Sequence, residues 1–159
     1  MERNFELVNG RWIGDGHPCF IIAEIGQNHQ GDVNVAKQLI KTAKDCGADC
    51  VKFQKSHLTT KFTKSVLERT YDSPHAFGNT YGDHKRFLEF SADQYQDLKQ
   101  YAASLNILFS ASAMDESSLD FLVQLGVPFI KIGSGDANNF LLLEKVAKTR
   151  LPVIYSTGK

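Results

Sequence analysis

Short apolar runs and longer amphipathic stretches alternate along this chain, and each apolar run ends in polar residues. Five runs follow this pattern, and their polar ends fall at 23–29, 51–54, 109–112, 130–136 and 153–159. Between most of them, apolar residues recur every three or four positions, which is the spacing of one helix face. The pattern predicts strands alternating with helices. Such strands pair in parallel and place reactive groups at their C-terminal ends.

Boundary residues refine this prediction. A helix is expected to begin near Asp32 and to stop at Gly47, and Ser91-Ala92-Asp93-Gln94 is a capping box that begins another. Further helices are expected from about 115 and over 139–149, and strands over about 19–25, 50–54, 107–112, 128–132 and from 153. Alternation in 50–54 turns Val51 and Phe53 toward the helices, and Lys52 and Gln54 inward.

Two segments stand outside the alternation. Residues 5–13 predict a β-hairpin around Asn9-Gly10, a pair that favours a type I′ turn. Residues 55–90 show no clean period and are expected to form a long functional loop. We therefore divide the chain into an N-terminal hairpin extension, 1–18, and a barrel domain, 19–159, that carries an insertion at 55–90.

The alternation fits two α/β folds, a (β/α)8 TIM barrel and an open doubly wound sheet. No Gly-x-Gly-x-x-Gly follows the first strand, which weakens a dinucleotide-binding fold. Polar residues end all five strands rather than meeting at one switch point, and this favours the barrel. A complete barrel needs eight strands and about 250 residues. Five strands in 159 residues predict an incomplete, N-terminal portion of a barrel.

Composition narrows the setting. Eighteen basic and 18 acidic residues cancel, so no overall charge favours nucleic acid or a membrane surface as partner. The N-terminus lacks an apolar signal region. The chain has three cysteines, Cys19, Cys46 and Cys50, and no two of them form a Cys-x-x-Cys motif. This predicts free thiols and a cytoplasmic location.

The strand ends carry candidate chemistry. Lys52 and Lys131 lie inside apolar runs, and two lysines that converge at one end of a barrel suit a phosphate or carboxylate. Hydroxyl donors follow on neighbouring strand ends, at Ser110, Ser112, Ser134 and Ser156. The alternative is a pair of structural ion pairs, for instance between Lys52 and Glu24.

Two carboxylates are candidate proton-transfer groups. Glu24 could act as a general acid or base, or could neutralise Lys52. Asp136 follows Gly133-Ser134-Gly135, where backbone N–H groups can approach a ligand closely; alternatively, it caps the next helix. His29 is the only histidine at a strand end, and no histidine or cysteine spacing predicts a metal site within these residues.

In series, these motifs resemble the sialic acid synthase family. The resemblance rests on Ile22-Ala-Glu-Ile-Gly-Gln-Asn-His-Gln-Gly-Asp32, Val51-Lys-Phe-Gln54, Lys131-Ile-Gly-Ser-Gly-Asp136 and Ser156-Thr-Gly158. Within 55–90, the sequences at 67–69, 80–82 and 84–91 resemble the animal members. The resemblance runs through nearly the whole chain.

The family joins phosphoenolpyruvate to N-acetylmannosamine, or to its 6-phosphate, and yields N-acetylneuraminate or its 9-phosphate. By resemblance, Lys52 and Lys131 bind phosphoenolpyruvate with Gln54 and with Ser112, Ser134 and Ser156, and Ser110 is a weaker candidate. Glu24 contacts the sugar and manages a proton, while Asp136 activates water. The resemblance also implies a divalent metal, Mn or Mg, with ligands outside this chain, and a homodimeric full-length enzyme.

Two rival hypotheses remain at this point. One is a Schiff-base aldolase on a similar barrel, with Lys52 or Lys131 as nucleophile. The other is a non-catalytic product of a truncated reading frame. Its open barrel would expose strand edges and apolar surface.

Overall fold

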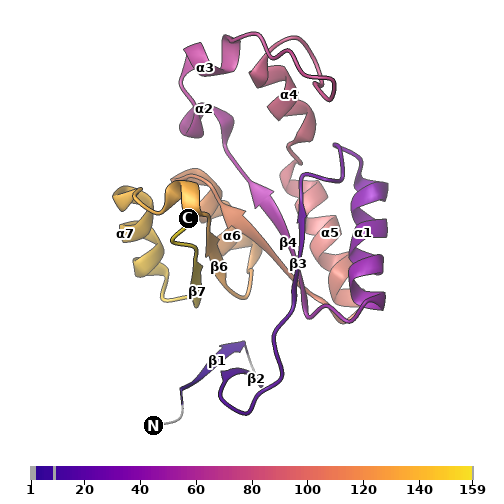
Figure 1. The fold of residues 1–159 in the computed structure, drawn as a ribbon, viewed down its shortest axis with the longest axis vertical. Coiled ribbons are helices and arrows are strands. Elements are labelled where there is room, and N and C mark those ends of the chain that lie inside the picture. The colour runs from indigo at the N-terminus through magenta and orange to yellow at the C-terminus, as the bar shows by residue number, and fades with distance from the viewer. Residues whose placement is uncertain (1–2, 9, 159) are drawn as a thin grey trace.

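The chain folds around a parallel sheet that its strands build in sequence order. The computed structural model describes residues 3–8 and 10–158. The five-stranded sheet has the order β3-β4-β5-β6-β7, and every neighbouring pair is parallel (Figure 1). The strands are β3 (Ile22–Gly26), β4 (Cys50–Lys55), β5 (Leu108–Ala113), β6 (Ile130–Ile132) and β7 (Val153–Tyr155).

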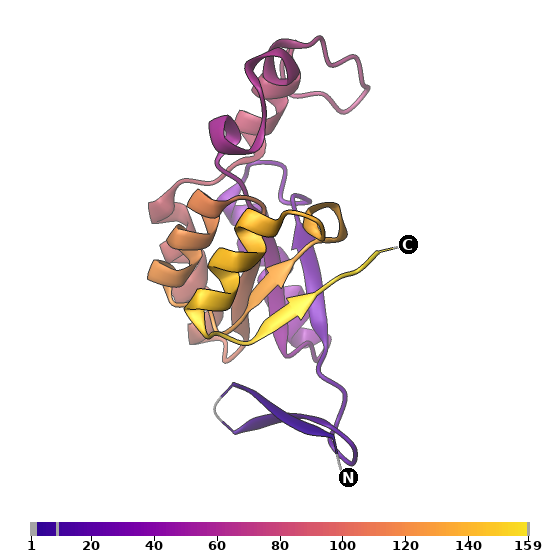
Figure 2. The same ribbon diagram turned by 90° about the vertical axis from the view of Figure 1, so that its left-hand side faces the viewer.

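Four helices cover one face of this sheet and leave the other face open (Figure 2). They are α1 (Val33–Asp45), α5 (Ala92–Ser104), α6 (Glu116–Leu125) and α7 (Phe140–Thr149). Val51 and Phe53 are fully buried in the core on the helical side, as the alternation predicts. A doubly wound sheet would carry helices on both faces and reverse its strand order. The unreversed order and the single helical layer therefore identify the portion of a TIM barrel that the sequence predicts.

The helix ends follow local chemistry. The Asp32 side chain accepts hydrogen bonds from the backbone N–H groups of Asn34 and Val35 at the start of α1. Ser91 and Gln94 form both hydrogen bonds of the predicted capping box at the start of α5. No helix within residues 3–8 and 10–158 is long and apolar enough to cross a bilayer.

The 55–90 segment is more ordered than its sequence suggests. It contains three helices, α2 (Leu58–Lys61), α3 (Lys64–Glu68) and α4 (Tyr81–Leu88), and it projects beyond the C-terminal ends of the strands (Figure 1). The prediction of a loop was wrong for these residues. Helices of four to eight residues are too short for a clear period. The capping box of Thr80 and Asp83 was the available signal for α4.

The predicted hairpin is present at the opposite end of the sheet. It consists of β1 (Asn4–Val8) and β2 (Arg11–Gly14), which pair antiparallel. Gly10 of the turn has φ +77°, as a type I′ turn requires, whereas Asn9 lies outside the described residues.

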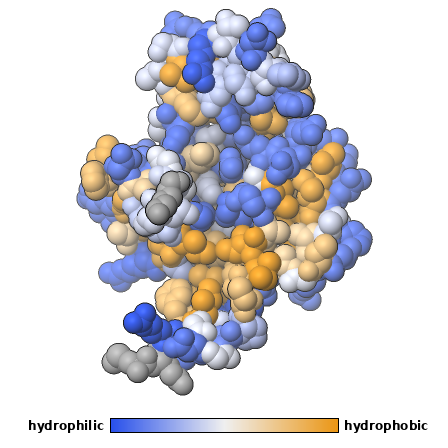
Figure 3. Space-filling view, viewed as in Figure 1, coloured by the Kyte–Doolittle hydropathy of each residue, from blue (hydrophilic) through white to orange (hydrophobic). Residues whose placement is uncertain are grey.

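The hairpin closes the lower end of the open face. A second apolar cluster joins hairpin residues to inward-facing residues at the N-terminal ends of the strands: Leu7, Val8 and Ile13 with Phe20, Ile22, Cys50, Leu108, Phe129 and Ile154. We call this cluster the lower layer. On the face that Figure 3 shows, apolar side chains gather near the hairpin, and the part of the surface over the 55–90 segment is mainly polar.

Candidate functional site

A polar cavity of about 290 Å³ lies at the C-terminal ends of the strands on the open face. We call it the strand-end cavity. Every strand of the main sheet contributes to it or is followed directly by a residue that does. It is lined by Glu24, Lys52, Gln54, Ser112, Met114, Lys131, Gly133, Ser134, Asp136 and Ser156. Eight of the nine site residues predicted from the sequence thus line one cavity.

Lys52 is the most buried cation of the cavity. Its side chain is 7% exposed, forms an ion pair with Glu24 and donates a hydrogen bond of 3.1 Å to Ser112 Oγ. Glu24 and Lys52 are register partners on β3 and β4, which accounts for their contact. The ion pair considered from the sequence therefore exists. The Glu24 side chain is 52% exposed, so it remains accessible to a ligand.

Lys131 is the second cation and lies across β5 from Lys52. Its Nζ donates hydrogen bonds to Ser156 Oγ and to the Ile132 carbonyl oxygen. Burial lowers the pKa of Lys131, and the positive charge of Lys52 lowers it further. Both lysines line the same cavity, so their ammonium groups share one site. A multiply charged anion placed between them would relieve their repulsion.

Asp136 is held by a residue that sequence reasoning missed. It lies in the short helix η1 (Ser134–Asp136), is 5% exposed, and forms an ion pair with Lys61 from α2. It does not cap the next helix, because Asn139 accepts the hydrogen bond from the Leu142 N–H at the start of α7. Lys61 lies in the aperiodic 55–90 segment, 75 positions away, and no local pattern signals the contact.

Ser110 does not reach the cavity. It is fully buried and donates a hydrogen bond of 3.0 Å to the Phe129 carbonyl oxygen. Alternation correctly turns Ser110 and Ser112 to the same face of β5. Ser110 lies one layer deeper, however, where its hydroxyl satisfies the backbone instead of a ligand.

His29 belongs to the packing above β3. It is 2% exposed and lies against Phe53 and Phe90, with ring centroids 5.8 and 4.0 Å away. Its Nδ1 accepts a hydrogen bond from the Gly31 N–H. Burial lowers the pKa of His29 to about 4, so the ring is neutral at pH 7. These contacts fit a structural histidine.

The cavity does not form a metal site from the described residues. No group of three or more His, Cys, Asp or Glu side chains within residues 3–8 and 10–158 could hold a metal ion. The two carboxylates of the cavity, Glu24 and Asp136, are each engaged by a lysine. The donor set therefore suits an anionic ligand and does not fit a divalent cation.

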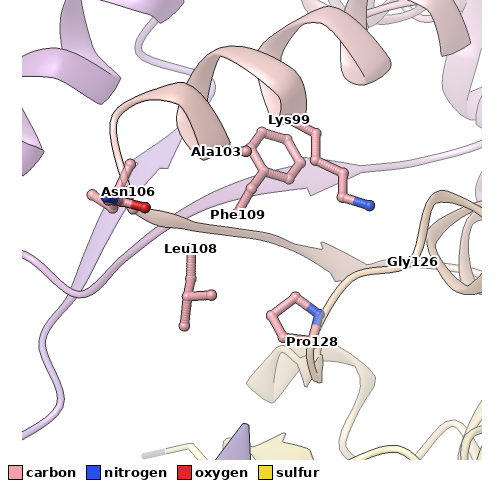
Figure 4. A pocket seen from close by; sticks show the side chains of 8 residues that line it. Lys99, Ala103, Asn106, Leu108, Phe109, Gly126 and Pro128 are labelled. Atoms are coloured by element: carbon pink, nitrogen blue, oxygen red, sulfur yellow. The ribbon is translucent and has the colours of Figure 1, made fainter. Parts of the chain in front are cut away.

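Another cavity, of about 400 Å³, opens at the opposite ends of β5 and β6 (Figure 4). It is lined mainly by apolar and backbone groups, among them Leu108, Phe109 and Pro128. Among the described residues that line it, Lys99 alone is charged, and the Lys99 Nζ donates to the Leu125 carbonyl oxygen. This cavity brings together no set of reactive groups, so the strand-end cavity is the candidate active site.

The chain is similar in sequence and fold to a group of known proteins. A model of the NeuB family matches residues 39–159. The N-acetylneuraminate-9-phosphate synthase of Mus musculus is 60% identical over 99% of this chain, and that of Drosophila melanogaster is 58% identical over 96%. A crystal structure of N-acetylneuraminic acid (sialic acid) synthetase from Leptospira borgpetersenii, in complex with citrate, superposes on 100% of the chain with a TM-score of 0.83 and 32% identity.

These relatives are longer than this chain. The chain covers 44% of the mouse protein, 40% of the fly protein and 51% of the Leptospira structure.

Proposed function

Because this chain belongs to the NeuB family, we propose that it forms the phosphoenolpyruvate-binding part of a sialic acid synthase. The proposed enzyme is a transferase that forms a C–C bond between phosphoenolpyruvate and N-acetylmannosamine 6-phosphate, and it yields N-acetylneuraminate 9-phosphate. The names of the mouse and fly relatives support the phosphorylated sugar over free N-acetylmannosamine. The observation that carries the proposal is the pair of lysines, Lys52 and Lys131, in one polar cavity.

The cavity is suited to an anion such as phosphoenolpyruvate. Lys52, Lys131 and Lys61 lie in or beside the cavity with two carboxylates, Glu24 and Asp136, which leaves one positive charge in excess. Ser112 and Ser156 already contact the two lysines, and Ser134 lines the same wall. Ammonium groups surrounded by hydroxyl donors suit a ligand that carries both a phosphate and a carboxylate. Gln54 adds a neutral amide beside them.

The proposed reaction divides proton handling between the two carboxylates. C3 of phosphoenolpyruvate attacks the aldehyde carbon of the open-chain sugar, and the aldehyde oxygen takes up a proton. Glu24 would deliver this proton as the protonated acid, after parting from Lys52. Water then adds to the cationic C2 and gives one proton to Asp136. The C2–O bond to phosphate breaks as C2=O forms, and the remaining hydroxyl proton leaves with the inorganic phosphate. The ion pair with Lys61 would hold the Asp136 carboxylate in place for that step.

We also propose a metal, an assembly and a cellular location for the whole protein. The divalent metal, Mn or Mg, would be held by residues outside this chain, and none of the steps assigned to the described side chains depends on it. A homodimer is the proposed assembly, in keeping with the family resemblance. A cytoplasmic location is proposed because Cys19, Cys46 and Cys50 are all unpaired.

Phosphoenolpyruvate binding tests the proposal directly. We expect calorimetric titration of residues 1–159 to show binding that Lys52→Ala and Lys131→Ala each weaken at least tenfold. Lys64→Ala is the matched control, because the Lys64 side chain is 86% exposed. In a longer protein that carries this sequence, the same two variants should abolish turnover. Unchanged phosphoenolpyruvate affinity in either variant would contradict the proposed site.

The lowered pKa of Lys131 favours a second candidate, a Schiff-base aldolase, because a desolvated lysine beside another cation is a better nucleophile. Borohydride reduction in the presence of pyruvate, followed by mass spectrometry, separates the two functions. A synthase that only binds its substrates leaves Lys131 unmodified, whereas an aldolase yields a covalent adduct there.

A further inference from the structure

A cavity outside the proposed phosphoenolpyruvate site lies between the β3–α1 loop and the 55–90 segment. We call it the loop cavity. Its volume is about 410 Å³, within the range of about 300–1,000 Å³ that small-molecule sites occupy. The loop contributes the carboxamides of Gln27 and Asn28, and the 55–90 segment contributes His75, Phe77 and His84. Amide groups suit the hydroxyl and acetamido groups of a sugar.

Gly26 stands between the loop cavity and the strand-end cavity. A Cβ placed on Gly26 would lie 3.4 Å from Glu24 Oε1, 3.6 Å from Gln54 Nε2 and 4.0 Å from Asn28 Nδ2. Glu24 and Gln54 line the strand-end cavity, and Asn28 lines the loop cavity. The two cavities are therefore neighbours, and a ligand that reacts at Glu24 can extend past Gly26 toward α4.

Lys85 lies next to the loop cavity without lining it: it contacts Gln27 of the lining, and its ammonium group lies over the Tyr81 ring. Its Nζ donates a hydrogen bond of 3.0 Å to the side-chain oxygen of Gln27. Among residues 3–8 and 10–158, no carboxylate forms an ion pair with Lys85. Glu89, whose charge acts on Lys85, pairs with Lys55 and accepts a hydrogen bond from Ser56. Lys85 is only partly exposed, so an anionic ligand would supply the missing charge.

His84 adds a directed donor beside Lys85. Its Nδ1 accepts a hydrogen bond of 3.2 Å from the Phe77 N–H, and its ring stacks on Phe77 at 5.7 Å. Because partial burial and the charge of Lys85 lower the pKa of His84, the ring is neutral at pH 7. A neutral ring that accepts at Nδ1 carries its proton at Nε2. In the part of the chain that the structure describes, no group accepts from that Nε2–H.

We propose that the loop cavity binds the phosphate of a phosphorylated sugar, with Lys85 and His84 as its ligands. This inference rests on the proposed function and adds to it the residues that distinguish a phosphorylated sugar from a free one. The reacting aldehyde lies near Glu24, the sugar chain passes Gly26, and the phosphate reaches the 55–90 segment. The 55–90 segment is then a specificity element for the distal end of the substrate.

The test compares two sugars on matched variants of the chain. N-acetylmannosamine 6-phosphate, free N-acetylmannosamine and inorganic phosphate are titrated into wild-type protein, Lys85→Gln and the control Lys64→Gln, and amide shifts are followed by NMR. We expect Lys85→Gln to weaken binding of the phosphorylated sugar about tenfold and to leave the free sugar unaffected. Lys85→Arg should restore binding, and Lys64→Gln should behave as wild type. Shifts should appear at Gln27, Phe77 and His84.

Three results would overturn the inference: equal losses for both sugars, no loss in Lys85→Gln, or no binding of either phosphate-bearing probe. Phosphoenolpyruvate titrated into the same samples keeps the two proposals apart. If phosphoenolpyruvate fails to bind while Lys85 still confers phosphate binding, the proposed function fails and the loop cavity stands. The opposite result rejects the loop cavity alone.

Discussion

The two ends of the open sheet face differ although the same five strands build both. At the lower end, inward-facing side chains are apolar and pack on the hairpin; at the upper end, they are charged or hydroxylated and line a cavity. Each strand makes the change over two to four positions, from Ile22 to Glu24, Cys50 to Lys52, Leu108 to Ser112, Phe129 to Lys131 and Ile154 to Ser156. On one sheet face, the residues that stabilise the fold and the residues that bind a ligand can therefore occupy different positions along the same strands.

The largest effect should follow from opening a space in the lower layer. Phe129→Ala removes a ring that is fully buried and packs edge-on against Phe20, so we expect a loss of about 3–5 kcal/mol in the free energy of unfolding. Urea unfolding measures it, with Phe140→Ala as control because Phe140 is 78% exposed. Similar losses in both variants would mean that the lower layer is not packed as described.

A substitution at the upper end should have the opposite effect: it should weaken ligand binding and leave stability nearly unchanged. Lys52→Met removes the buried ammonium group but keeps an aliphatic chain, and Glu24, left without its partner, is half exposed to water. We expect phosphoenolpyruvate affinity to fall about a hundredfold, while the free energy of unfolding changes by no more than about 1 kcal/mol. Calorimetric titration and urea unfolding on one preparation provide both values. A large loss of stability with intact binding would remove the distinction between the two ends.

Lowering the pH should destabilise the β3–α1 loop around His29 before it destabilises the lower layer. The pKa of His29 is about 4 in the folded chain and about 6.5 when unfolded, so the unfolded chain binds more protons between these pH values. The free energy of unfolding should therefore fall as the pH drops from 6.5 to 4, by about 2 kcal/mol. Urea unfolding at pH 7 and pH 4.5 tests this, with His29→Phe expected to show a smaller loss. Hydrogen exchange should rise first around the β3–α1 loop.

The smallest effect should come from a substitution at Ser110, which lies between the lower layer and the strand-end cavity. Ser110→Ala leaves the Phe129 carbonyl without its side-chain donor, which costs about 1 kcal/mol of stability. Phosphoenolpyruvate affinity should not change, because Ser110 does not line the cavity. Ser112→Ala is the paired variant: it removes the hydroxyl that Lys52 contacts and should weaken binding. If Ser110→Ala weakens binding equally, the site extends deeper than the cavity.

The sequence predicted the elements wherever a local rule governs them. Helix caps at Asp32 and Ser91 and the inward orientation of Lys52 follow from contacts within a few residues or from simple alternation. The alternating pattern placed the candidate site residues on strand ends, the family resemblance implied their roles, and the structure gathers eight of them in one cavity.

What the sequence could not predict depends on contacts between distant segments. The ion pair of Lys61 with Asp136 and the hydrogen bond of Lys85 with Gln27 both arise from how the 55–90 segment folds back over the strands. The different depths of Ser110 and Ser112 depend on packing from neighbouring strands, because alternation gives side-chain direction and no depth.

The hairpin also constrains the order of events during synthesis on the ribosome. Leu7 is translated before every strand it packs against, yet its partners include Phe129 and Ile154, more than a hundred positions later. Closing so long a loop is entropically costly until the sheet has assembled, so the hairpin, although made before these strands, should dock last. Trp12 on β2, the single tryptophan, provides the probe: in refolding, its fluorescence change should lag behind the far-ultraviolet circular dichroism of the helices.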